Sequence, residues 1–137
     1  MPRIEHTDYY SSILGMSLKV EVTGHFGFPI IMFPTSQGQY TQNHDFKLNE
    51  SINHFIDQGK VKLYNIETID KYSFYDKNIS ASERIHNYEL YMQFLIQEFV
   101  PYIQKIHSVH RVAVAGASFG GYHASNFAFR FPDVVSH

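Results

Sequence analysis

The sequence contains no cysteine and no tryptophan, and neither sign of charge dominates it. Without cysteine the chain cannot form a disulfide scaffold, a thiolate metal site or a cysteine nucleophile. Its 11 Lys and Arg residues are balanced by 13 Asp and Glu residues, which gives a formal net charge of −2. This near-balance argues against nucleic acid or an anionic membrane surface as a partner.

Long apolar runs are missing as well. No segment approaches the roughly 20 apolar residues that a membrane-spanning helix needs. Residues 1–6 also lack the apolar core of a secretory signal. We therefore expect a cytoplasmic protein without a membrane partner.

What the chain does contain is enough apolar material for one core. Its 137 residues are 44% hydrophobic, which predicts a single domain over residues 1–137. Of the nine histidines, only His107 and His110 have a helical i,i+3 spacing. No carboxylate completes a recognisable ligand set with them, so we expect neither a metal site nor another cofactor.

The most informative stretch is residues 112–122, which read Val-Ala-Val-Ala-Gly-Ala-Ser-Phe-Gly-Gly-Tyr. The apolar run before Gly116 is typical of a strand buried on both faces. A Gly-x-Ser-x-Gly pentapeptide follows, and apolar residues then recur at helical spacing as far as Phe131. This strand, turn and helix context indicates a nucleophile elbow, a strained turn that exposes the Ser118 hydroxyl. The alternative is a Gly-Ser turn without chemistry.

The rest of the chain alternates strand patterns with helix patterns. Expected strands, the first two forming a β-hairpin, cover residues 5–13, 17–22, 28–33, 61–66 and 111–115. A short helix after Asn49 should end at Gly59, and the Ser80-x-x-Glu83 capping box should begin a long helix. Pro101 should bend that long helix near residues 97–98. The pattern predicts an α/β fold, a mostly parallel sheet flanked by helices.

The long helix should cover the sheet with an apolar stripe. Its members lie three or four residues apart, at Ile85, Tyr88, Met92, Leu95, Phe99 and Ile103, with Ile106 as a candidate for the last position. The short helix should likewise turn one face inward, which carries Ile52, Phe55 and Ile56.

The sequence resembles the α/β-hydrolase superfamily, and within it the serine esterases whose elbow reads Gly-Ala-Ser-Phe-Gly-Gly-Tyr, here residues 116–122. The run from Ile30 to Gly38 is similar to that family's strand and oxyanion-loop segment. The resemblance implies an acyl-enzyme on Ser118, formed from a small-molecule ester. The backbone N–H of Phe119 would be one oxyanion donor, and the N–H of Ser36, or next Gln37, would be the other.

Aromatic side chains of the loop over residues 67–79 are candidates for a substrate pocket. Tyr72 and Tyr75, with Phe74 between them, could form its wall. The alternative is that these three side chains pack the loop onto the sheet.

A serine nucleophile needs a general base, which a carboxylate orients. After Ser118 the only candidates are His123, Asp133 and His137. By helical geometry His123 points about 140° away from Ser118, and Asp133 lies roughly 20 Å along the helix. We therefore expect the base and its carboxylate to lie outside this chain. The chain would then be the N-terminal portion of the fold, truncated after the elbow helix, and it would be inactive alone.

Two expectations follow from such a truncation. The strand at residues 112–115 would have a bare edge, which favours self-association. The missing base also leaves other functions open, namely an acyltransferase on the same fold or a non-catalytic binding or assembly module.

Overall fold

The computed structural model describes residues 3–34 and 50–137. Their strands form a five-stranded sheet in the order β1-β2-β4-β3-β5. The strand bounds are Ile4–Ser11 for β1, Met16–Thr23 for β2, Phe28–Phe33 for β3, Val61–Ile66 for β4 and Ala113–Gly116 for β5. The predicted strands are therefore all present, with ends that differ by a few residues.

The sheet is mixed. β1 and β2 form the predicted antiparallel hairpin, and β2 pairs with β4 in the same sense. β3 lies between β4 and β5 and is parallel to both. The carboxyl ends of these three parallel strands therefore lie at one edge of the sheet, where ligands bind in open α/β sheets.

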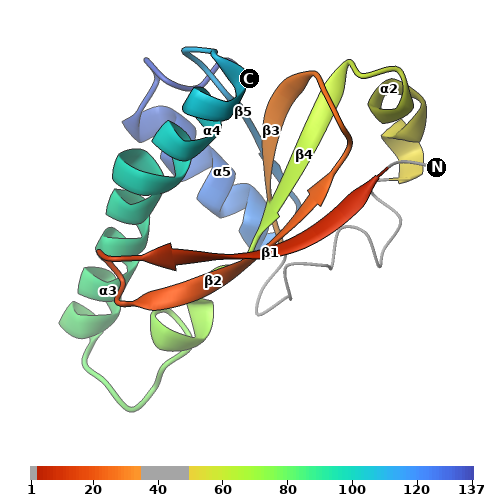
Figure 1. Ribbon diagram of the computed structural model, residues 1–137. Coiled ribbons are helices and arrows are strands. Elements are labelled where there is room, and N and C mark those ends of the chain that lie inside the picture. The colour runs from red at the N-terminus through yellow and green to blue at the C-terminus, as the bar shows by residue number, and fades with distance from the viewer. Residues whose placement is uncertain (1–2, 35–49) are drawn as a thin grey trace.

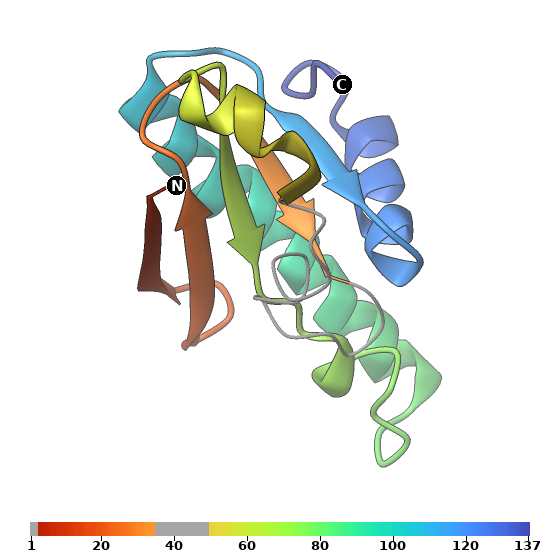
Figure 2. The same ribbon diagram turned by 90° about the vertical axis from the view of Figure 1, so that its right-hand side faces the viewer.

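Helices cover both faces of the sheet (Figures 1 and 2). On one face lie η1 (Glu50–Ile52) and α2 (Asn53–Asp57). The other face carries α3 (Ala81–Phe94), the π-helical turn η3 (Leu95–Phe99), α4 (Val100–His107) and α5 (Phe119–Arg130), while η2 (Asp70–Tyr72) follows β4. None of the helices in residues 3–34 and 50–137 is long and apolar enough to cross a membrane.

The α2 helix ends as its sequence predicts. Gly59 has a φ of +72°, the N–H of Gly59 donates to the Ile56 carbonyl, and the N–H of Lys60 donates to the Phe55 carbonyl. These two bonds form a Schellman motif. Asn49, the expected cap, lies outside the described residues. The predicted apolar face is narrower than expected, because Ile56 is buried whereas Phe55 is 47% exposed.

Ser80 is confirmed as the N-cap of α3, since the N–H of Glu83 donates to Ser80 Oγ. The other bond of the predicted capping box differs, because Glu83 Oε1 accepts from the Ser80 hydroxyl. The centre of the apolar stripe is confirmed too, with buried side chains at Tyr88, Met92, Leu95, Phe99 and Ile103. The prediction is wrong for the two ends of the stripe, because Ile85 and Ile106 are about half exposed, at 57% and 49%. In Figure 2 the first turns of α3 extend past the end of the sheet.

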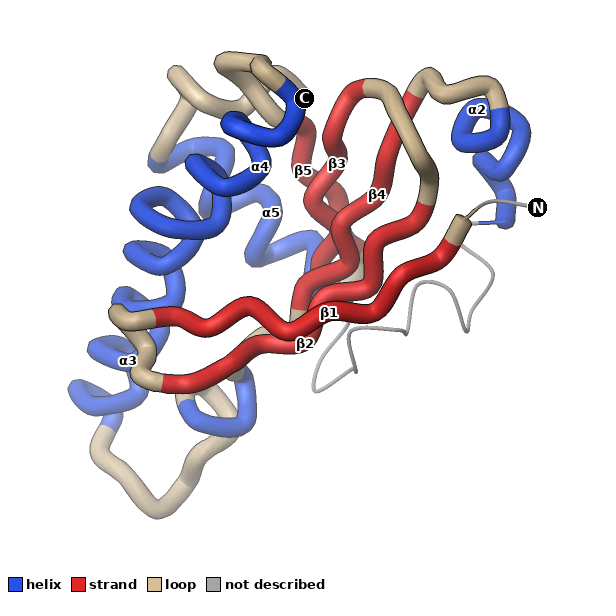
Figure 3. Tube along the Cα trace, viewed as in Figure 1, coloured by secondary structure: helices blue, strands red, loops and turns tan. Residues whose placement is uncertain are grey.

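The helix changes type just before Pro101. Proline has no N–H to donate to the carbonyl four residues earlier, and the turn that contains this carbonyl, η3, is π-helical. This change places Glu98 beside the β1–β2 turn, which reaches toward the helices in Figure 3. Glu98 Oε1 accepts from the Ser11 hydroxyl at 2.6 Å, and Oε2 accepts from the N–H and hydroxyl of Ser12 at 3.1 and 3.0 Å. The interruption therefore anchors the hairpin.

The outer edge of β5 is not bare, so the expectation of an unpaired strand there is wrong. Val112 bridges Val135 in parallel, and Ser136 N–H donates to the Val112 carbonyl at 2.9 Å. Val114 N–H donates to the carbonyl of His137, also at 2.9 Å. The chain turns back after α5, and its last residues take the place of a neighbouring strand. Self-association remains a prediction.

Candidate active site

A short turn joins the end of β5 to the start of α5. β5 ends at Gly116 and α5 begins at Phe119. Ser118 between them has φ +56° and ψ −126°. For a residue with a Cβ this region of backbone space is strained, and such strain clusters at functional sites. The Ser118 side chain is exposed, so its hydroxyl is open to solvent at the carboxyl ends of the parallel strands.

Two glycines allow this turn to be so tight. A Cβ on Gly116 would lie 2.3 Å from the carbonyl carbon and oxygen of Gly120. A Cβ on Gly120 would lie 2.4 Å from the Pro34 carbonyl oxygen and 2.5 Å from that of Phe33. The first turn of α5 is thus pressed against both β5 and the end of β3.

Aromatic side chains of the loop after β4 surround Phe119. The Phe119 ring lies 5.4 Å from the ring of Phe74 and 5.8 Å from that of Tyr75, both edge-on. Tyr122 stacks on Phe119 at 5.2 Å. Tyr72 lies elsewhere, in a separate hollow that it shares with Leu14, Met16, Ile69, Asn87 and Leu90. Of the two tyrosines predicted to line a pocket, the structure therefore brings only Tyr75 to the turn.

Directly beneath the turn lies a buried carboxylate and imidazole pair that the sequence did not reveal. His123 on α5 is fully buried, and Asp70 in η2 is 2% exposed. His123 Nε2 lies 2.8 Å from Asp70 Oδ1. In the sequence, His123 was a candidate only for the general base. Its partner was missed because Asp70 is 53 residues away in the chain.

The second nitrogen of His123 is engaged as well. Nδ1 lies 3.2 Å from the hydroxyl oxygen of Tyr88 on α3, which accepts a hydrogen bond from Asn126 Nδ2 at 3.1 Å. Burial raises the pKa of Tyr88, so this hydroxyl stays protonated and can donate. When Tyr88 donates to Nδ1, the Nε2–H of His123 donates to Asp70, and the hydrogen bonds run in one direction from Asn126 to Tyr88 to His123 to Asp70.

Of the remaining candidate residues, the structure describes only Asp133 and His137. Ser36 and Gln37 lie outside the described residues. Asp133 follows the far end of α5, and His137 Nδ1 lies 3.1 Å from the hydroxyl of Ser136.

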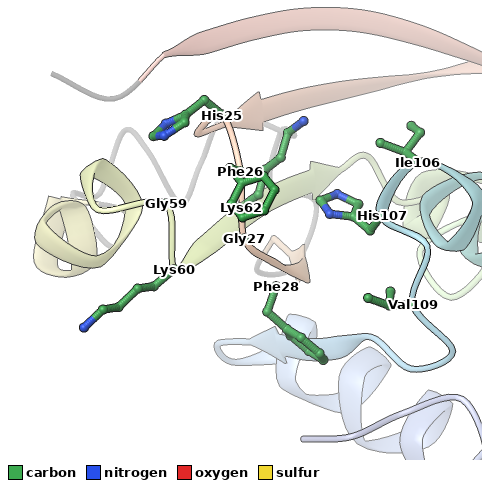
Figure 4. A pocket seen from close by; sticks show the side chains of 10 residues that line it. All are labelled: His25, Phe26, Gly27, Phe28, Gly59, Lys60, Lys62, Ile106, His107 and Val109. Carbon is green, nitrogen blue, oxygen red and sulfur yellow. The ribbon is translucent and has the colours of Figure 1, made fainter.

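A larger hollow of about 470 Å³ lies at the opposite end of the sheet (Figure 4). It is lined from the starts of β3 and β4 and the end of α4, by residues that include Phe28, Lys62 and His107. His107 Nε2 bonds to the Tyr64 hydroxyl at 2.7 Å. Burial and the nearby charge of Lys62 hold the pKa of His107 below its ordinary value of 6.5. This hollow lies at the amino ends of the strands, so it is not continuous with Ser118.

Comparison with solved structures shows the same fold in esterases and related hydrolases. An S-formylglutathione hydrolase from Staphylococcus aureus matches with a TM-score of 0.69 and 17% identity, over 98% of this chain and 55% of that one. A ferulic acid esterase from Anaeromyces mucronatus matches with a TM-score of 0.71 and 13% identity, over 99% and 56%. A fluorophosphonate-binding serine hydrolase of S. aureus matches with a TM-score of 0.68 and 18% identity, over 98% of this chain and 54% of that one.

This chain thus spans about 55% of the length of the structures it resembles. A search of curated proteins found no match. The family model described as "Putative esterase" matches residues 29–137, which include β3, the β5–α5 turn and all of α5. The chain therefore belongs to this esterase family and has an α/β-hydrolase-like fold that covers about 55% of the length of the similar structures.

Proposed function

We propose that this chain carries the nucleophile of a serine esterase and that Ser118 forms the acyl-enzyme. The observation that carries the proposal is the strained, exposed backbone of Ser118 between β5 and α5. Such a turn holds the hydroxyl clear of the sheet, where an ester carbonyl can approach it. The esterase family and the esterases among the similar structures support this choice of reaction.

In the reaction, Ser118 Oγ attacks the ester carbonyl carbon and loses its proton to a general base. The carbonyl oxygen becomes an oxyanion, which needs hydrogen-bond donors. As the first residue of α5, Phe119 has an N–H with no acceptor inside the helix. The positive end of the α5 dipole also favours negative charge there. The second donor would come from Ser36 or Gln37, and each donor contributes about 2.7–4 kcal/mol of transition-state stabilisation.

The general base and its carboxylate would be supplied from outside this chain. Both ring nitrogens of His123 are already engaged, by Asp70 and by Tyr88, so His123 cannot take the Ser118 proton without breaking this network. Asp133 lies beyond the far end of α5. The base would return its proton to the leaving alcohol, and water would then release the acid from Ser118.

The test is labelling of the full-length protein with a fluorophosphonate probe, which phosphonylates an activated serine. We expect labelling of the wild-type protein and none of the Ser118→Ala variant. Unchanged labelling of Ser118→Ala would contradict the proposal. Transfer of the acyl group to an added alcohol in preference to water would indicate an acyltransferase. The chain of residues 1–137 alone should stay within the ~10³–10⁴-fold over background that an oxyanion hole and binding provide without a triad.

A further inference from the structure

The Asp70–His123 pair is an unusual feature for a small core, because both side chains are almost fully buried. Replacement of a buried ion pair by well-packed apolar residues of similar volume is often neutral or stabilising. Asp70 Oδ2 is also buried, and no residue in 3–34 or 50–137 gives it a hydrogen bond. A purely apolar contact would therefore stabilise the core at least as well. Stability alone does not explain the pair.

The pair lies next to Phe119, whose backbone N–H is the proposed oxyanion donor. The His123 ring meets the Phe119 ring edge-on, with centroids 4.8 Å apart. On its other sides it contacts Phe33 of β3 and Tyr88 of α3, at 5.9 and 5.4 Å. His123 is thus wedged between the sheet, α3 and the first residue of α5.

Hydrogen bonds at both ring nitrogens fix the orientation of the His123 imidazole. Nε2 is bound to Asp70 and Nδ1 to Tyr88, so the imidazole cannot rotate without losing both partners. Asp70 is itself held by the backbone of its loop, where the N–H groups of Ser73 and Tyr75 donate to its carbonyl at 3.2 and 3.0 Å. The same loop supplies Phe74 and Tyr75 to the Phe119 ring.

We infer that Asp70 and His123 are positioning residues that lock the first turn of α5, and with it Ser118 Oγ and the Phe119 N–H, against the loop after β4. The inference rests on the proposed function for its catalytic consequence. The lock itself is a property of the fold. Gly120 holds the turn from the side of β3 and Gly116 from the side of β5, and the pair holds it from the side of α3.

The test compares substitutions in the full-length protein. Asp70→Leu removes the acceptor of His123 Nε2 at similar volume, whereas Asp70→Asn keeps a carbonyl oxygen there. The matched control is Tyr64→Phe, which removes a hydrogen bond to a partly buried histidine, His107, at the other end of the sheet. All variants are assayed at a temperature where circular dichroism shows them folded.

With p-nitrophenyl acetate we expect Asp70→Leu to lower kcat about 10- to 100-fold with KM within about twofold, because a misplacement of about 1 Å costs about 10²-fold. Asp70→Asn should recover most of this loss, and Tyr64→Phe should stay within about twofold of wild type. Wild-type kcat in folded Asp70→Leu would overturn the inference. An equal loss in Tyr64→Phe would overturn it as well, because stability alone would then explain the effect.

A second readout is independent of the reaction. Hydrogen exchange at the amides of Gly120, Gly121 and Tyr122, which bond back to residues 117 and 118, should be faster in Asp70→Leu than in Tyr64→Phe, and Asp70→Asn should restore most of the wild-type protection. Equal exchange would contradict the lock. If the wild-type protein neither reacts with the fluorophosphonate probe nor hydrolyses the ester, the proposed function fails. The hydrogen-exchange comparison would still test whether Asp70 and His123 lock the first turn of α5. If Asp70→Leu does not fold, Tyr88→Phe, which removes the hydroxyl bound to His123 Nδ1, decides it by the same comparison with Tyr64→Phe.

Discussion

Gly116 lies against the Gly120 carbonyl across the β5–α5 turn, and a Cβ on Gly120 would in turn meet the carbonyls of Phe33 and Pro34, so neither glycine can carry a side chain. A Cβ on Gly116 would lie 2.3 Å from the Gly120 carbonyl, closer than real Cβ atoms approach. Both clashes are with backbone, which cannot swing aside as a flexible side chain can. The two glycines of the pentapeptide are therefore required by packing, whatever Ser118 does.

Substitution of these glycines should destabilise the protein. We expect Gly116→Ala and Gly120→Ala each to lower the free energy of unfolding by at least the ~1–3 kcal/mol typical of overpacking. The matched control is Gly121→Ala, whose Cβ would lie 3.2 Å from a carbonyl oxygen and which sits inside a helix, where alanine is favoured. Urea denaturation should show little change for the control, and a similar loss in all three variants would argue against this packing explanation.

Relief of the strain at Ser118 should stabilise the fold. Glycine adopts φ +56° and ψ −126° at little cost, whereas residues in such sparsely populated regions pay about 1–3 kcal/mol. We expect Ser118→Gly to raise the free energy of unfolding by up to this amount. Ser118→Ala, which keeps a Cβ, should not. Both variants should lose fluorophosphonate labelling, so a rise in stability for Ser118→Ala as well would show that backbone strain is not the cause.

The last residues of the chain should protect the edge of β5. Ser136→Pro removes the N–H that donates to the Val112 carbonyl, while Ser136→Ala keeps it. We expect light scattering to show more self-association for the proline variant, because an unpaired strand edge pairs with other chains. Equal scattering from the proline and alanine variants, at matched concentration, would argue that this pairing does not protect the edge.

Glu98 should make the hairpin contact sensitive to acid. Burial raises its pKa, but the hydrogen bonds donated by residues 11–13 outweigh this, so the pKa of Glu98 is lowered from 4.5. The contribution to stability is therefore full above pH 4.5 and is lost as the pH falls through the lowered value. We expect the gap in urea midpoint between wild type and Glu98→Gln to be largest near pH 7 and to shrink toward pH 3. A gap that does not change with pH would contradict this.

Much of the local structure follows from short stretches of sequence. The capping box at Ser80, the end of α2 at Gly59 and the hairpin each depend on residues a few positions apart. Pro101 marked the place where the helix changes type, although its missing N–H does not say that the result is a π-helical turn. The β5–α5 turn belongs to the same group, because glycine spacing and an apolar strand are local signals.

Contacts between distant segments were not predictable in this way. The sequence by itself determined the α/β class, the position of Ser118 and the need for glycines on either side of it. Only the tertiary structure decided that Asp70 meets His123, that Glu98 holds the hairpin turn and that residues 135–136 pair with Val112. The physical reason is that propensity and periodicity act over one or two turns of chain, whereas these partners are 23 to 87 residues apart and meet only when the sheet and helices pack.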